Sequence, residues 1–146
     1  MSLIALTIAV HTMGVVLMSL VMIRIKAWQE TRNLCLLHVI PIVIGMVSGA
    51  GLLLVTLHLI EATIWGAAYV WLGVLDSSKD AILYSLDQMT TRGASGIRLQ
   101  PNWRMMGALE AVNGLLLFGI STAYIFALMQ AYWPILSKSF LHTDGR

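Results

Sequence analysis

The chain has 146 residues, of which 58% are hydrophobic and only 11% are charged. A soluble domain of this size carries more charge on its surface, so the composition argues against a water-soluble globular protein and indicates an integral membrane protein. The formal net charge of +2 is too small to indicate a nucleic-acid-binding protein. The single cysteine, Cys35, excludes an internal disulfide and a cysteine metal cluster.

The first apolar run extends from Ser2 to Ile23, and His11 is its only acidic or basic side chain. Its length is close to the roughly 20 residues that cross a bilayer as a helix. We expect a membrane span with a core or interfacial His11. A signal peptide is not expected, because the positive charges follow the run instead of preceding it. They lie in a polar hinge at residues 24–33, which has three basic residues and one acidic residue.

The second apolar run, residues 34–75, has His38, His58 and Glu61 as its only acidic or basic side chains. As a single helix it would be about 63 Å long at 1.5 Å per residue, which is twice the hydrocarbon thickness of a bilayer. Two interpretations are open. The run is either two spans that fold back at residues 48–51 (SGAG), or one long helix that leaves the membrane at its Pro41 end.

The rest of the chain holds a polar interval at residues 76–102, a third apolar run at 105–133 and a charged tail at 134–146. The hinge has three basic residues and the tail has two, and the positive-inside rule puts both on the cytoplasmic side. This arrangement requires a single span in the second run. We therefore favour three spans, with the N-terminus outside and a loose cytoplasmic tail.

The polar interval begins with a helix-starting pattern. Ser77-Ser78-Lys79-Asp80 fits a capping box, and the following AILYSLDQMT predicts a helix of about ten to twelve residues. Such a helix is too short to span a membrane, so we expect it to be re-entrant. It leads directly into Thr90 to Gly96, with the sequence TTRGASG. The carbonyls of such a segment can replace the hydration shell of an alkali ion if its glycines adopt positive φ.

Residues 84–96, YSLDQMTTRGASG, resemble the pore domain of potassium channels, in which a short pore helix ends in Thr-Thr-Val-Gly-Tyr-Gly-Asp. Thr90, Thr91 and Gly93 match that filter. Further on, Trp103-Arg104 and the stretch GALEAVNGLLLFGISTAYIFALM are similar to the inner helix of small bacterial two-helix pore proteins. HLIE at residues 58–61 looks like part of their outer helix. The resemblance covers about residues 52–130 and implies a homotetramer that conducts a monovalent cation through a central pore.

The loop departs from the family's filter. Arg92 replaces the Val, Ala94 the Tyr, Ser95 the second Gly and Gly96 the Asp. Four copies of Arg92 around one axis would oppose cation entry. An Arg92 side chain that points away from the axis needs a partner. The predicted partner is Asp87, five residues back at the end of the pore helix.

Polar side chains in the apolar runs are further candidate site residues. His58 and Glu61 lie three residues apart on one helix face. They either bind a proton or a metal ion, or form a polar lock to a neighbouring helix, with Asn113 or Glu110 as its target. Glu110 either lines an outer vestibule or braces the re-entrant helix. Together with Glu110, we expect Tyr84 and Asp87 to support the filter-like loop.

Two glycines of the last run, Gly114 and Gly119, lie five residues apart where members of the channel family carry inner-helix glycines. They act either as gating hinges or as close-packing points, since small residues let transmembrane helices approach each other.

These observations predict an all-α integral membrane protein with three transmembrane helices, a short re-entrant pore helix and a filter-like loop. Its expected parts are an extra N-terminal helix with its hinge (1–33), a channel-like pore domain (34–133, with the pore loop at 76–102) and the tail (134–146). We expect a homotetrameric ion channel in a bacterial inner membrane, with altered selectivity. No bound group is expected except K⁺ or another monovalent cation.

Other functions are open as well. A degenerate pore fold could act as a non-conducting structural or accessory subunit of a larger membrane complex. A small proton-coupled carrier or a metal site would use His58 and Glu61. An enzyme is not expected, because no nucleophile–base pair, phosphate loop or dinucleotide fingerprint is visible in the sequence.

Overall fold

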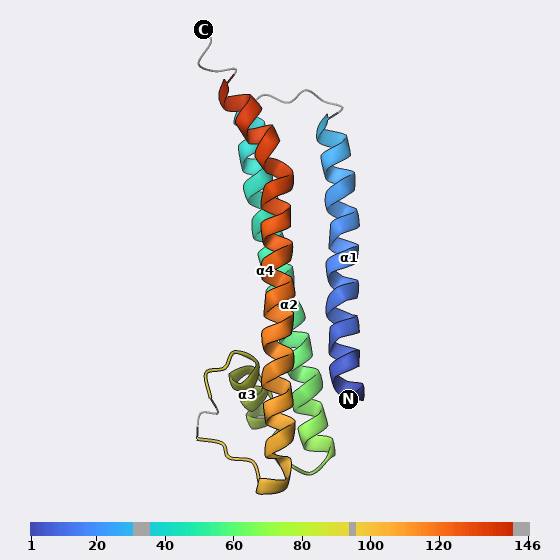
Figure 1. The fold of residues 1–146 in the computed structure, drawn as a ribbon, viewed down its shortest axis with the longest axis vertical. Helices are drawn as coiled ribbons and strands as arrows, with labels where there is room; N and C mark the ends of the chain where they lie inside the picture. Colours follow the sequence, from blue (N-terminus) through green and yellow to red (C-terminus); the bar gives the residue numbers. More distant parts are fainter. Residues whose placement is uncertain (31–35, 94–95, 142–146) are drawn as a thin grey trace. The chain divides into compact units, whose positions relative to one another are not determined.

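The structure is a computed structural model that describes residues 1–30, 36–93 and 96–141. These residues form four α-helices and one 3-10 helix, with no strand among them (Figure 1). The α-helices are α1 (Ser2–Glu30), α2 (Leu36–Trp71), α3 (Ser78–Met89) and α4 (Arg104–Leu141), and the 3-10 helix η1 (Pro101–Trp103) precedes α4. The described part of the chain is therefore all-α, as predicted.

Three of the helices are long and apolar enough to cross a membrane. The candidate spans are Ser2–Trp28 in α1, Ile40–Trp71 in α2, and Pro101–Pro134, which covers η1 and most of α4. The length and composition of these helices thus indicate an integral membrane protein with three candidate spans, which agrees with the number of spans predicted from the sequence.

The second apolar run forms one helix and not two. α2 continues without a break through residues 48–51 and ends at Trp71. A glycine inside a helix costs only about 1 kcal/mol relative to alanine, so Gly49 and Gly51 do not end a helix whose neighbours favour it.

Two helices are longer than the hydropathy pattern predicted. α1 continues beyond Ile23 through the first part of the polar hinge to Glu30, because residues 24–30 contain neither glycine nor proline. α4 continues through Pro134 to Leu141, so this part of the tail is helical where we expected a loose segment. Residues 31–33 of the hinge and 142–146 of the tail lie outside the described residues.

The chain divides into two compact units, and α1, α2 and α4 each contribute a segment to both. Unit 1 consists of Met1–Met13 and Val55–Ile120, and it contains the whole of α3. Unit 2 consists of Gly14–Leu54 and Ser121–Arg146. The core of unit 2 is built from buried apolar and aromatic side chains: Met18, Val43, Met46, Ala50, Leu128 and Tyr132.

α3 starts where the capping box predicted. Ser77 is the N-cap residue, with an extended backbone, and its hydroxyl accepts a hydrogen bond from the amide of Asp80 at 3.3 Å. This bond satisfies one of the amide groups that a helix leaves unpaired at its N-terminus. In unit 1, α3 lies beside α2 and the first part of α4 (Figure 1).

Candidate functional site

Glycines on α2 and α4 allow α3 to lie very close to both helices. A methyl group on Gly66 of α2 would lie 2.9 Å from Cγ1 of Ile82 on α3. A methyl group on Gly114 of α4 would lie 2.6 Å from Cα and from the carbonyl oxygen of Met89, at the end of α3. Gly114 is therefore a close-packing point. Around Gly119, no described residue lies within 4 Å of such a methyl group, so no packing contact within the described chain explains this glycine.

The buried carboxyl group of Glu110 joins α4 to α2 and to α3. It accepts a hydrogen bond from the hydroxyl of Tyr69 on α2 at 2.7 Å, and another from the hydroxyl of Ser85 on α3. All three side chains are fully buried. Of the two roles predicted for Glu110, this geometry supports the bracing of α3.

Tyr84 belongs to the same packed region. Its ring lies edge-on to the ring of Tyr69, with 5.3 Å between the centroids. Burial, and secondly the nearby carboxyl group of Glu110, raises the pKa of the Tyr84 hydroxyl above its usual value. The side chain therefore packs α3 against α2, and the support of the filter-like loop that we expected from Tyr84 stays a prediction.

The end of α3 closes as a tight turn. The amide of Thr91 donates to the carbonyl of Gln88, and the amide of Arg92 donates to the carbonyl of Asp87, both at 3.0 Å. Thr91 has a φ of 55°, in the left-handed region. These two bonds around a left-handed residue form a Schellman motif, in which glycine usually takes the place that Thr91 has here.

The remaining filter-like residues follow this turn. The Thr90 hydroxyl donates to the carbonyl of Leu86 at 2.6 Å, as part of the helix end. Gly93 and Gly96 have φ values of 81° and 83°. Thr91 and Gly93 thus both have positive φ, although only the second is a glycine. Ala94 and Ser95 lie outside the described residues, and the other five residues of the loop are exposed.

The predicted pairing of Asp87 with Arg92 is confirmed. Nε of Arg92 lies 3.1 Å from Oδ1 of Asp87. The Asp87 side chain is 4% exposed, whereas that of Arg92 is 68% exposed. The Schellman turn explains the contact, because it brings residue 92 back over residue 87 at the end of the helix.

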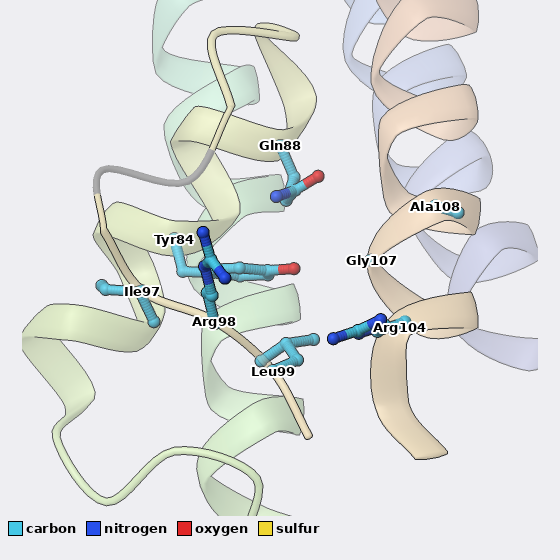
Figure 2. Close-up of a pocket in the computed structure, with 8 residues that line it drawn as sticks. All are labelled: Tyr84, Gln88, Ile97, Arg98, Leu99, Arg104, Gly107 and Ala108. Atoms are coloured by element: carbon cyan, nitrogen blue, oxygen red, sulfur yellow. The ribbon is translucent and has the colours of Figure 1, made fainter. Parts of the chain in front are cut away.

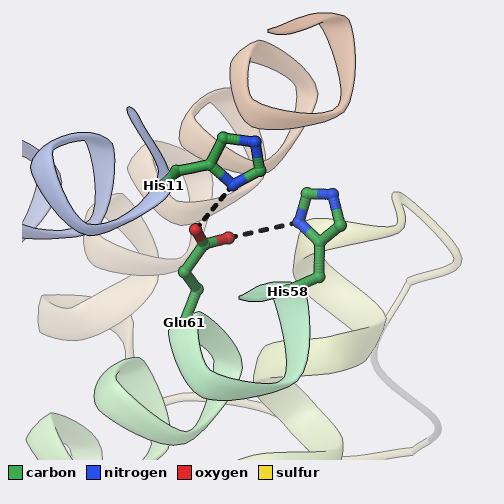
Figure 3. Close-up of side chains that lie close together, drawn as sticks. All are labelled: His11, His58 and Glu61. Atoms are coloured by element: carbon green, nitrogen blue, oxygen red, sulfur yellow. Dashed lines mark hydrogen bonds and ion pairs between the residues drawn. The ribbon is translucent and has the colours of Figure 1, made fainter. Parts of the chain in front are cut away.

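A second polar cluster consists of His11 on α1 and of His58 and Glu61 on α2. Figure 3 shows both imidazole rings turned toward the carboxyl group of Glu61. Nδ1 of His11 lies 2.8 Å from Oε1, and Nδ1 of His58 lies 3.2 Å from Oε2. His11 and Glu61 are fully buried and His58 is 8% exposed. The ring of His58 also stacks on Phe118 of α4, with centroids 4.0 Å apart.

This cluster differs from the polar lock that we expected. His58 and Glu61 do meet a neighbouring helix, but their partner is His11 and not Asn113 or Glu110. Nδ2 of Asn113 instead donates to the hydroxyl of Thr7 on α1 at 2.9 Å. His11 was recognisable as a candidate, since an isolated basic side chain in an apolar run is a functional suspect by default. The sequence contains no comparable signal for Thr7.

An open groove of about 420 Å³ lies between α3, the segment after the loop, and α4 (Figure 2). Tyr84 and Gln88 line it from α3, and Arg98 and Arg104 bring two guanidinium groups to it. A methyl group on Gly107, also in the lining, would lie 2.5 Å from the Tyr84 hydroxyl. The groove therefore combines a tightly packed tyrosine with two positive charges.

Comparisons of the chain with protein-family models, with curated proteins and with solved structures gave no match. The functional argument therefore rests on the residues of this chain. They place a braced short helix with an exposed turn, and a buried histidine–glutamate cluster, in one unit of a protein with three candidate spans.

Proposed function

We propose that the chain is a pore-loop membrane protein of the potassium-channel-like type, which assembles as a homotetramer and passively conducts a monovalent cation with altered selectivity. The observation that carries this proposal is the short helix α3, which is held firmly between α2 and α4 and ends in an exposed loop. One such loop supplies a quarter of a filter, so the proposal requires four copies of the chain.

The position of α3 along α4 supports a re-entrant helix. Met89, the last residue of α3, packs against Gly114, ten residues after the first residue of α4, Arg104. At 1.5 Å per residue this contact lies about 15 Å along α4, which is about half the thickness of the hydrocarbon layer. The partial negative charge at the C-terminus of α3 would then favour a cation near the middle of the membrane.

The exposure of the loop supports an assembly of several copies. Thr90, Thr91 and Arg92 are exposed in the single chain. Irregular backbone at membrane depth is tolerated only where it lines a water-filled cavity or is covered by protein. Four loops around an axis would meet this condition. We place this assembly in a bacterial inner membrane, with the N-terminus outside and the C-terminus in the cytoplasm.

The second candidate function is that of a non-conducting structural or accessory subunit of a larger membrane complex. The Schellman turn at the end of α3 favours it, because the amides of Thr91 and Arg92 turn the chain back where a filter would extend. The exposed guanidinium of Arg92 also favours it, since four such groups near an axis repel cations.

Copy number in a mild detergent, measured by native mass spectrometry, is the first test of the proposed function. The channel proposal predicts a ring of four identical chains. A single copy bound to other membrane proteins would contradict the channel and support the accessory subunit.

Cation flux into liposomes is the second test. If the loops line the path, Arg92→Val should raise K⁺ flux roughly tenfold or more, because four positive charges are removed from the loops and the four Asp87 carboxylates behind them are no longer compensated. Arg98→Val is the matched control, since it removes the same charge outside residues 90–96. A tetramer without flux in the wild type and in Arg92→Val would overturn conduction.

A further inference from the structure

We propose that His11, His58 and Glu61 form a binding site for a divalent transition-metal ion of the zinc class. The site is buried in unit 1 and joins α1 to α2. The filter-like loop contributes no residue to it. The inference therefore stands whether or not the chain conducts ions.

The donor atoms are of the kind and number that such a metal requires. Two imidazole nitrogens and one carboxylate are a ligand set typical of zinc and its neighbours in the periodic table. Calcium and magnesium prefer oxygen ligands alone, so this set selects against them. Together with the two imidazole nitrogens, both carboxylate oxygens of Glu61, or one of them and a water molecule, would give the metal four donor atoms.

The distances between the donor atoms also fit. At about 2.0 Å from a tetrahedral metal, two ligand atoms lie about 3.3 Å from each other. The two nitrogen–oxygen distances are 2.8 and 3.2 Å, and one ligand atom from each residue can be chosen so that all lie within 4.8 Å of one another. A metal ion would therefore need only small movements of the side chains. Figure 3 shows that both rings already present Nδ1 to the carboxyl group.

The electrostatics of the site favour a bound cation. With two neutral histidines and an ionised Glu61, the buried cluster would carry one negative charge. An uncompensated charge inside a membrane protein is costly, and a divalent cation coordinated by the carboxylate would compensate it. An ion pair with one protonated imidazole, or hydrogen bonds from two neutral rings, is the competing explanation for the same geometry.

The location of the site suggests what the metal does. His11 and Glu61 are 50 residues apart in the sequence and belong to different helices. A metal ion that binds both would fasten α1 to α2 within unit 1, in addition to the packing between them. Metal binding of this kind adds directly to folding stability, because the site exists only in the folded chain.

Zinc titration of the full-length protein in detergent, after removal of any affinity tag, tests the inference. Bound Zn²⁺ per chain is measured by elemental analysis after dialysis, and the apparent melting temperature is followed with added Zn²⁺ or chelator. We expect one Zn²⁺ per chain and a melting temperature that falls when the chelator removes it.

Substitutions at His11 separate a metal site from a hydrogen-bonded lock. His11→Gln keeps a hydrogen-bond donor for Glu61 but is a poor ligand, so Zn²⁺ affinity should fall roughly tenfold or more. His11→Cys keeps a zinc ligand and should retain binding. Glu61→Gln should weaken binding in the same way as His11→Gln. Glu110→Gln is the matched control, because it alters a buried carboxyl group that has only hydroxyl partners.

Two results would overturn the metal site. One is a wild-type protein that retains no Zn²⁺ after dialysis, which is decisive even if a variant fails to fold. The other is a His11→Gln protein that binds Zn²⁺ as tightly as the wild type and has the same stability, which would identify the cluster as a hydrogen-bonded lock.

Discussion

The two units of the chain are built from the same three long helices, but they bury different kinds of side chains. Unit 1 buries eight of the polar or charged residues found buried in the described part of the chain: Thr7, His11, His58, Glu61, Ser85, Asp87, Glu110 and Asn113. Unit 2 buries one, Ser121. Between helices in lipid, apolar contacts give no hydrophobic driving force, and polar groups are costly unless they are paired. We therefore expect the polar groups of unit 1 to mark the part of the chain that carries the proposed function.

The contrast also concerns the way the helices are held together. In unit 1 the short helix α3 is attached through the hydrogen bond from Ser85 to Glu110 and through close contacts at Gly66 and Gly114. In unit 2 the buried cluster consists of methionine, valine, alanine, leucine and tyrosine side chains. We therefore expect the stability of unit 1 to be sensitive to the loss of one hydrogen bond or the addition of one methyl group. Unit 2 should tolerate substitutions that preserve side-chain volume.

The largest effect is expected at Glu110. Glu110→Ala removes the acceptor of both the Tyr69 and the Ser85 hydroxyls and leaves a cavity, so we expect a loss of about 2–3 kcal/mol in stability. Unfolding of the detergent-solubilised protein with a denaturing detergent measures this loss. Ser85→Ala removes one of the two bonds and should cost less. Equal stability of Glu110→Ala and wild type would show that Glu110 does not brace α3.

The second largest loss of stability is expected at Gly114, which packs against the end of α3. Gly114→Ala places a methyl group 2.6 Å from the backbone of Met89, which must move, at a cost of about 2 kcal/mol. Gly119→Ala is the matched control, since none of the residues that the structure describes lies within 4 Å of its added methyl group. It should be neutral, or stabilising by up to about 1 kcal/mol because alanine favours the helix. If both variants lose stability equally, the close packing of Gly114 against Met89 does not explain the loss in Gly114→Ala.

A pair of tyrosine substitutions compares the two units directly. Tyr69→Phe in unit 1 removes a hydrogen bond to Glu110 and should cost about 1 kcal/mol. Tyr132→Phe in unit 2 removes a buried hydroxyl that has no hydrogen-bond partner among the described residues, so its effect should stay within about 0.5 kcal/mol. The same denaturation assay measures both. A larger loss for Tyr132→Phe would reverse the contrast between the units.

The smallest effect on stability is expected at Arg92. Its side chain is largely exposed, so water screens its charge, and Arg92→Gln keeps a hydrogen-bond donor for the buried Asp87; the change in stability should be about 0.5 kcal/mol. The same substitution should clearly alter ion flux if the loop lines a pore. A stability loss as large as that of Glu110→Ala would instead assign the Asp87–Arg92 pair a structural role.

Some features of the site followed from local sequence. The capping box at Ser77 predicted the start of α3 because the cap involves residues only three apart. The pairing of Asp87 with Arg92 was also predictable, since the two residues lie five apart at a helix end. The start of the tail was wrongly expected to be loose, and the sequence did not show that α1 continues to Glu30, because hydropathy indicates the ends of a membrane span and not the ends of a helix.

By itself, the sequence determined the number of candidate spans, the position of the short helix and the residues of the exposed loop, because apolar run length and helix capping are local properties. Only the tertiary structure decided that His11 joins Glu61 and His58, that Glu110 binds Tyr69 and Ser85, and that Gly114 is tightly packed while Gly119 is not. These contacts join residues on different helices. Helix periodicity shows which residues share a face, but the packing of one helix on another determines which residue each face meets.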